Sequence, residues 1–206
     1  MQKEELELQR NELKETRGEF EVQNNTMKRQ RFENTFFNLV SIMNLNRRRA
    51  DDIVGFIKFH EEFKSQLLEN KVIQSLSNAV TNNELDLYLN TGMNIYDSVY
   101  TGTVRGTMNL YYKNLFAIQT YIDASELISA EEKLFYMNVF YSQMSNYEVS
   151  LTAYHLLFLR DGLLKQELSK PTDVAKKYGL TKNFDIGLQF TDVMPRLLQH
   201  NKFDLF

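Results

Sequence analysis

Apolar side chains recur every seven residues in the first part of the chain: Leu6, Leu13, Phe20 and Met27. The positions three residues further along are polar in every repeat: Gln9, Thr16, Gln23 and Gln30. A two-stranded coiled coil is apolar at both of these heptad positions, so the sequence has only half of the usual contact line. Two interpretations stay open, a solvated charged helix without a preferred partner and a loose contact between the helices of an oligomer.

No glycine or proline interrupts the chain from Glu19 to Leu45, where a second apolar segment contains Phe32, Phe36 and Met43. One helix that runs from the first heptad through this segment to Leu45 would measure about 66 Å. A globule of this chain length is only about 45 Å across, so the front of the helix must project. We predict a heptad-repeat stalk over residues 1–30, in which Leu6, Leu13, Phe20 and Met27 form an oligomer contact, and a helical bundle domain over residues 31–206.

The rest of the sequence predicts helices throughout, because alternation with period two is nowhere sustained. The expected elements are a helix over 49–70 with a short segment to residue 80, a helix opened by a capping box at 81–84, a bend between residues 102 and 106, a long helix opened by a capping box at 129–132 and ending at 161–162, and a helix that starts at Pro171 and ends at Gly179. The predicted fold class is all-α, with a long coiled-coil-like amino-terminal helix leading into a bundle of about six helices.

Composition and charge narrow the function classes. The chain has no cysteine, which excludes disulfide frameworks, thiolate metal sites and cysteine nucleophiles. Its net charge of -3 argues against a wholly basic nucleic-acid binder. A basic patch is nevertheless expected where the stalk meets the bundle: Lys28, Arg29, Arg31, Arg47, Arg48 and Arg49. Such a patch is either a solvated corner or a contact for phosphate or anionic lipid.

The sequence contains no run of 18 apolar residues, and its first ten residues are rich in glutamate rather than apolar. We therefore expect neither a membrane-spanning helix nor a secretory signal within the chain. The predicted location is the cytoplasm, with the inner face of the cell membrane as the alternative if an anchor precedes Met1.

The segment 134–159 is apolar nearly all the way round, which is typical of a helix surrounded by others. Gln143, Tyr147 and Glu148 interrupt it. A carboxylate enclosed in such a helix needs a hydrogen-bond donor, which a tyrosine hydroxyl or an arginine could supply. The sequence leaves open whether these residues form a structural network or a pocket.

Four ordered motifs carry a resemblance to a known family: Arg31-Phe32-Glu33-Asn34-Thr35-Phe36-Phe37-Asn38-Leu39, Tyr111-Tyr112-Lys113-Asn114-Leu115-Phe116, Phe135-Tyr136 leading to Gln143-Met144-Ser145-Asn146-Tyr147-Glu148, and Lys177-Tyr178-Gly179-Leu180. With the heptads before them, they resemble the AbiC-like family of phage abortive infection proteins. The resemblance implies a bacterial defence protein that curtails phage propagation at the expense of the infected cell. It also implies that members often carry transmembrane helices ahead of the heptads.

The resemblance further implies a polar interior site in which the family-motif residues converge: Asn34, Asn38, Tyr112, Asn114, Gln143, Ser145, Tyr147 and Glu148. The family often has a histidine before the asparagine at position 44 and another at position 114, where this chain has Met43 and Asn114. A metal or general-base role for those histidines is therefore not carried over, and the roles of the site residues stay unassigned.

No catalytic motif stands out. Phosphate-loop and nucleophile-elbow patterns are absent, and none of His60, His155 and His200 has a second histidine one helical turn away. Arg196 and His200 approach the arginine–histidine pattern of helical ribonuclease toxins, but their spacer is too short. We predict no cofactor and no metal.

The predicted function is abortive infection by a non-enzymatic effector or sensor that self-associates, with a toxic ribonuclease or other enzyme built around Glu148 as the alternative. The expected partner is a second copy of the chain. A second defence subunit or a phage-derived trigger is a further candidate, and nucleic acid has weaker support.

Overall fold

In the computed structural model, which describes residues 2–53, 55–76, 81–101, 105–159 and 165–180, no strand occurs and the regular elements are helices. In chain order they are α1 (Gln2–Ile53), α2 (Phe56–Glu69), α3 (Lys71–Ser75), α4 (Asn82–Val99), α5 (Arg105–Ala124), α6 (Ala130–Tyr141), α7 (Asn146–Leu159) and α8 (Lys165–Tyr178). The predicted all-α fold is confirmed.

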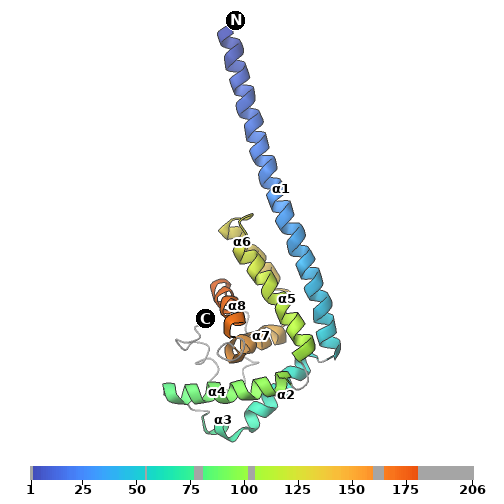
Figure 1. Ribbon diagram of the computed structural model, residues 1–206, viewed down its shortest axis with the longest axis vertical. Coiled ribbons are helices and arrows are strands. Elements are labelled where there is room, and N and C mark those ends of the chain that lie inside the picture. Colours follow the sequence, from blue (N-terminus) through green and yellow to red (C-terminus); the bar gives the residue numbers. More distant parts are fainter. Residues whose placement is uncertain (1, 54, 77–80, 102–104, 160–164, 181–206) are drawn as a thin grey trace.

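The first helix dominates the shape of the molecule. It contains 52 residues, so it is about 78 Å long, and its amino-terminal half extends well past every other helix (Figure 1). The predicted apolar line lies on this half, where Leu6, Leu13, Phe20 and Met27 are 58%, 70%, 66% and 50% exposed. A helix that projects from a bundle is therefore present, whereas the division into two domains at residue 30 stays a prediction.

The second half of α1 packs along α5 and also contacts α6 through Tyr136. Phe32 and Phe36 are fully buried, and the Phe32 ring lies 5.2 Å from the ring of Tyr121 and 4.9 Å from the ring of Tyr136. The Tyr121 hydroxyl also donates to the Phe32 carbonyl, at 3.3 Å. These aromatic contacts fix the base of the projecting helix to the bundle.

The helix boundary predicted between Leu45 and Arg49 is wrong. Arginine is a good helix former, and α1 continues through Arg47 to Ile53. The chain turns at Gly55, whose φ of 73° lies in the left-handed region that favours glycine.

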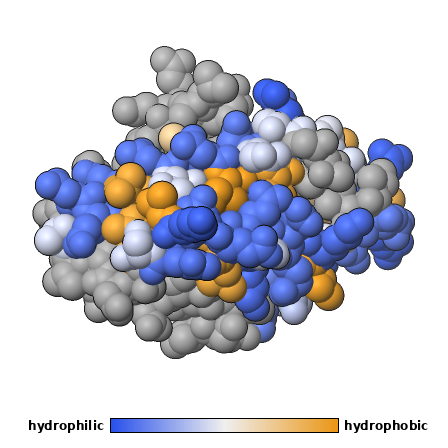
Figure 2. Space-filling model, turned by 90° about the horizontal axis from the view of Figure 1, so that it is seen from below, coloured by the Kyte–Doolittle hydropathy of each residue, from blue (hydrophilic) through white to orange (hydrophobic). Residues whose placement is uncertain are grey.

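Helices α2, α3 and α4 form the end of the bundle opposite the amino terminus (Figure 1). The capping box predicted at 81–84 is confirmed, because Thr81 Oγ1 accepts from the Glu84 amide and Glu84 Oε2 accepts from the Thr81 amide. Seen from this end, the surface is mainly hydrophilic around a band of apolar side chains (Figure 2). The large apolar side chains that these helices expose are Ile57, Leu68, Val72 and Leu87.

The long helix predicted from 129 to 162 is wrong, because a turn at 142–145 divides it into α6 and α7. Its start is confirmed by the capping box in which Ser129 and Glu132 bond to each other's backbone amides. The division follows from a third capping box: Ser145 Oγ accepts from the Glu148 amide at 3.3 Å, and Glu148 Oε2 accepts from the Ser145 amide at 2.9 Å.

The last described helix starts earlier than predicted. Pro171 lies inside α8 rather than at its start, although a proline there removes one backbone hydrogen bond and its ring crowds the carbonyl of the preceding turn. The predicted end is confirmed, because Gly179 follows α8 with a φ of 67°.

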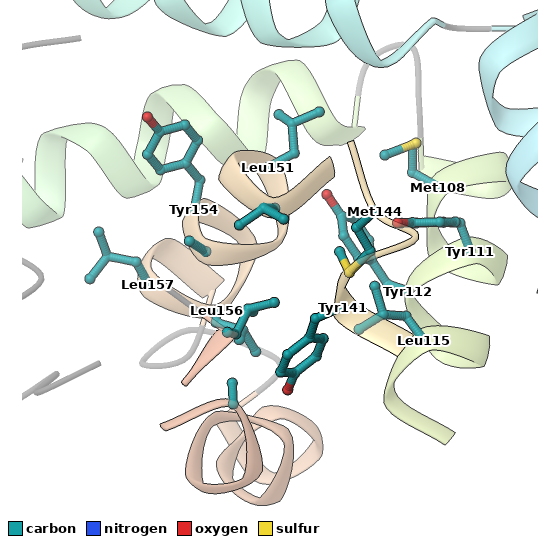
Figure 3. Close-up of a cluster of buried hydrophobic side chains, with 14 of the residues drawn as sticks. Met108, Tyr111, Tyr112, Leu115, Tyr141, Met144, Leu151, Tyr154, Leu156 and Leu157 are labelled. Atoms are coloured by element: carbon teal, nitrogen blue, oxygen red, sulfur yellow. The ribbon is translucent and has the colours of Figure 1, made fainter. Parts of the chain in front are cut away.

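The core contains side chains from every part of the bundle, and α5 and α7 contribute many of them. Met108, Tyr111, Tyr112 and Leu115 project from α5 toward Tyr141 and Met144 and toward the leucine-rich surface of α7 (Figure 3). All described residues from Leu151 to Phe158 are buried, so α7 is the enclosed helix that the apolar segment predicts.

Candidate functional site

A buried carboxylate joins three helices at the start of α7. Glu148 is only 1% exposed, and its Oε1 accepts a hydrogen bond from the Tyr111 hydroxyl of α5 at 2.9 Å. Its Oε2 lies 2.8 Å from Arg47 Nη2 of α1 and also accepts from the Ser145 amide and hydroxyl, at 2.9 and 2.8 Å. The donors thus include a tyrosine and an arginine, the two kinds of side chain that the sequence predicts for an enclosed Glu148, and Ser145 in addition.

Arg47 makes a second contact that strengthens this joint. Its Nη1 donates to the Gln143 carbonyl in the turn between α6 and α7, at 3.1 Å. One guanidinium therefore holds both the turn and the first residues of α7 against α1. Burial, and the adjacent Glu148 carboxylate, raise the pKa of the Tyr111 hydroxyl well above its ordinary value, so Tyr111 keeps its proton and acts as a donor.

The chemistry of this arrangement is that of a structural network. Both Glu148 oxygens are engaged by protein donors, one of which is a guanidinium, and the side chain is almost fully buried, so the carboxylate does not face an open site. A general acid or base must instead reach a substrate proton. In the part of the chain that the structure describes, no group of three histidine or carboxylate side chains is arranged to hold a metal ion.

Tyr112 belongs to an aromatic cluster on the other side of the same core. Its ring stacks on His155 of α7 with a centroid distance of 3.9 Å, and the Tyr96 hydroxyl of α4 lies 3.3 Å from His155 Nδ1. Burial lowers the pKa of His155 to about 3, so the imidazole is neutral at physiological pH. Glu148 and His155 therefore sit seven residues apart on α7 and contact the adjacent residues Tyr111 and Tyr112 of α5.

Four predicted site residues do not join this interior. Asn34 and Asn38 are exposed on α1, and the Gln143 side chain is exposed although its carbonyl binds Arg47. The Asn114 amide donates to the Leu110 carbonyl of its own helix. The structure therefore does not bring these four residues together with Glu148.

Tyr147 lies apart from both the Glu148 side chain and the four residues just described. It is partly buried, and its ring meets the His60 ring edge to face at 5.2 Å. It therefore belongs to the contact between α2 and α7. It is not part of the Glu148 cluster, by which we mean Glu148 with its partners Arg47, Tyr111 and Ser145. Of the predicted site, the structure joins Ser145 and Glu148 directly and places Tyr112 next to Tyr111.

The predicted basic patch divides into two groups along α1. The first group is Lys28, Arg29 and Arg31, and the second is Arg47, Arg48 and Arg49. Arg31 and Arg47 are 16 positions apart, which is about 24 Å of helix. Arg29 lies 3.2 Å from Glu33 and 3.6 Å from Glu132, and Arg47 is bound to Glu148. The six residues therefore do not lie together along α1, and one of them, Arg47, is the ion-pair partner of the buried Glu148.

The last motif fixes α8 to the end of α5. Lys177 Nζ and the Tyr178 hydroxyl lie 2.6 and 2.9 Å from the same Asp123 oxygen. Partial burial alone would raise the pKa of Asp123, but the hydrogen bonds from Lys177 and Tyr178 outweigh it and hold that pKa below its ordinary value.

A surface groove of about 870 Å³ opens elsewhere, between α5, α1 and α8. Leu39, Phe116, Tyr121 and Pro171 line its apolar part, and none of the eight predicted site residues borders it. The groove is therefore separate from the Glu148 cluster.

Two functional features were missed in the sequence. Ser145 and Glu148 have the same Ser-x-x-Glu spacing as the two capping boxes that were found, and this signal would have predicted the break between α6 and α7. Nothing local in the sequence links Arg47 to Glu148, because that pairing depends on how α1 lies against α7. The proposed ribonuclease pair Arg196 and His200 lies outside the described residues.

Residues 103–187 match the family model putAbiC, described as "putative phage abortive infection protein". The match covers α5 to α8 and includes three of the four motifs, Tyr111, Ser145 and Glu148 among them, whereas the Arg31–Leu39 motif and Arg47 precede it. No curated protein and no solved structure matches the chain. No helix in the described part of the chain is long and apolar enough to cross a membrane.

Proposed function

Because residues 103–187 of this chain carry a domain of the phage abortive infection family, we propose that the protein defends a bacterial cell against phage by abortive infection. In this proposal it is a non-enzymatic effector or sensor that works through self-association. The observation that supports self-association is the exposed apolar line on the projecting half of α1.

The exposure of that line favours a partner. Leu13 and Phe20 are 70% and 66% exposed, and every described side chain from Glu5 to Arg31 is exposed. A helix with no tertiary packing is only marginally stable in water. Burying leucine and phenylalanine against another helix contributes about 1.5–3 kcal/mol for each side chain, which supports association.

The Glu148 cluster supports a non-enzymatic role. The family motifs supply contacts that hold helices together: Tyr111 and Ser145 on Glu148, and Lys177 and Tyr178 on Asp123. Arg47 connects these contacts to the helix that carries the apolar line. Association at one end of α1 can therefore act on the bundle through one continuous helix. A second defence subunit or a phage-derived trigger would bind in addition to this contact.

The proposal is tested by replacing apolar residues of the stalk with glutamate. Leu6→Glu, Leu13→Glu and Phe20→Glu together should abolish oligomers and reduce protection in a phage plating assay to the level of cells without the protein. The matched control carries Leu8→Glu and Val22→Glu, two equally exposed apolar positions of α1 on the opposite side of the helix. That control should associate and protect like the wild type.

Full protection by the triple variant would overturn the proposal. Loss of protection in both variants would also contradict it, since charge anywhere on the stalk would then be harmful. The enzyme alternative makes the reverse prediction, in which the stalk variant defends and Glu148→Gln fails at an unchanged melting temperature.

A further inference from the structure

We infer that two copies of this chain pair through residues 5–30 of α1 in a parallel, in-register coiled coil. This inference rests on the self-association proposed above and specifies its geometry. Three features of α1 carry it: how its apolar and polar positions are layered, where its charges flank the apolar line, and where the heptad pattern ends.

The layering favours parallel strands. In a parallel, in-register pair each position meets its own copy, so Leu6, Leu13, Phe20 and Met27 form apolar layers. The intervening layers then pair Gln9, Thr16 and Gln23 with themselves, and two glutamine amides can bond to each other. An antiparallel pair would set each leucine against a glutamine, which buries polar groups without such a match.

The flanking charges indicate the same orientation. Glu5 and Glu12 precede the apolar residue of their heptads, and Arg10 and Arg17 follow it by four positions. In a parallel coiled coil these two flanking positions meet between chains, so Glu5 faces Arg10 of the second copy and Glu12 faces Arg17 of the second copy. An antiparallel pair of the stalks would instead place glutamate beside glutamate.

These charges are not used within one chain. Glu and Arg five residues apart do not face each other on a helix, unlike pairs three or four apart. Among the described residues, none of Glu5, Arg10, Glu12 and Arg17 takes part in an ion pair, whereas Arg29 and Arg47 further along the same helix do. The stalk therefore carries two complementary pairs that only a second copy can complete.

The pairing has a defined end. After Met27 the same heptad position holds Asn34, Ser41 and Arg48, so the apolar line stops. Lys28 and Arg31 lie at this point and form no ion pair with another described residue. Like charges on the two copies favour separation of the helices there, which places the two bundles side by side at the same end of the stalk.

The absence of cysteine makes the geometry measurable in the full-length chain. Gln9→Cys and Gln23→Cys place thiols in the polar layers and leave the apolar line intact. In a parallel, in-register pair each variant should form a disulfide-linked dimer on mild oxidation, because facing residues are within disulfide reach. Asn11→Cys and Asn25→Cys lie on the outer face and serve as controls that should stay monomeric on a denaturing gel.

Orientation is read from a mixture of the Gln9→Cys and Gln23→Cys proteins, each marked by a different tag. Parallel pairing predicts links only between identical variants, since positions 9 and 23 are about 21 Å apart along the helix. Links between the two variants, or a link in only one of them, would overturn the inference and leave self-association standing. An absence of dimers in the wild-type chain would overturn both.

A charge exchange gives an independent reading. Glu12→Arg should weaken the dimer about tenfold in dissociation constant, because it sets arginine against Arg17 of the second copy. Glu12→Arg combined with Arg17→Glu should return the dissociation constant to within about threefold of the wild type. A combined variant as weak as the single one would contradict the parallel arrangement.

Discussion

Arg47 and Glu148 are 101 residues apart in the sequence, and their side chains meet at 2.8 Å between α1 and α7. Glu148 is almost fully buried, whereas Arg47 keeps about a third of its side chain exposed. The pair connects a helix outside the matched family segment to the centre of that segment. The projecting helix is therefore an integral part of the bundle through its base.

Arg47→Met should destabilise the folded chain by about 2–4 kcal/mol, because it leaves a buried carboxylate with fewer donors. The expected readout is a lower urea midpoint at unchanged m-value. Glu148→Gln should cost less in the Arg47→Met background than in the wild type, since the two side chains share one interaction.

Arg48→Met is the matched control for the ion pair. Arg48 is exposed, is the next residue along α1 and forms no ion pair with a described residue. Its substitution should change stability by less than about 0.5 kcal/mol. Equal losses in the Arg47 and Arg48 variants would contradict the role assigned to the buried pair.

Gly92→Ala tests the contact between α4 and α7. A Cβ at Gly92 would lie 2.6 Å from the Phe158 ring, although alanine is the better helix former. We expect a net loss of about 1–2 kcal/mol in thermal or urea unfolding. Gly106→Ala on α5, where a Cβ meets nothing within 4 Å, should be neutral or stabilising, and a stabilised Gly92→Ala would show that the two helices are not so closely packed.

The free energy of unfolding should decrease at acid pH, in part because of His155. Burial lowers its pKa to about 3, whereas an unfolded histidine has a pKa near 6.5. Between these values the unfolded chain binds a proton that the folded chain does not, so the free energy of unfolding falls as the pH falls from about 6.5 toward 3. The slope from this residue alone reaches about 1.4 kcal/mol per pH unit.

His155→Phe keeps the stacking on Tyr112 and removes the titrating group. Its free energy of unfolding, measured in urea between pH 7 and pH 4.5, should fall less steeply than that of the wild type. Parallel curves for the two proteins would mean that His155 is protonated in the folded state or stays accessible to water.

Local patterns predicted the helices better than their contacts. The heptads predicted the projecting half of α1. The capping boxes at 81–84 and 129–132 predicted true helix starts, because a capping box is formed by two residues only three positions apart and does not depend on tertiary contacts. The long helix over 129–162 was wrong because a continuous apolar segment conceals a turn. A polar residue such as Ser145 can cap one helix as easily as it can sit within another.

The candidate site shows the same limit. Burial of Glu148 predicted the kinds of donor that it needs, but Tyr111 and Arg47 could be identified only once α1, α5 and α7 were placed together. Asn34 and Asn38 stand in the segment 31–39, for which the sequence predicts a family motif, yet they are exposed, since this segment packs through Phe32 and Phe36. The motifs identified segments that pack into the bundle. They did not show which of their polar residues are buried, as Glu148 is, and which are exposed, as Asn34 and Asn38 are.

Self-association is measured by sedimentation equilibrium from micromolar to submillimolar concentration, with the wild type compared with the Leu6→Glu, Leu13→Glu, Phe20→Glu variant. We expect a reversible dimer for the wild type and for the Leu8→Glu, Val22→Glu control, and a folded monomer for the triple variant. A wild-type chain that stays at 24.3 kDa over the whole range would contradict self-association.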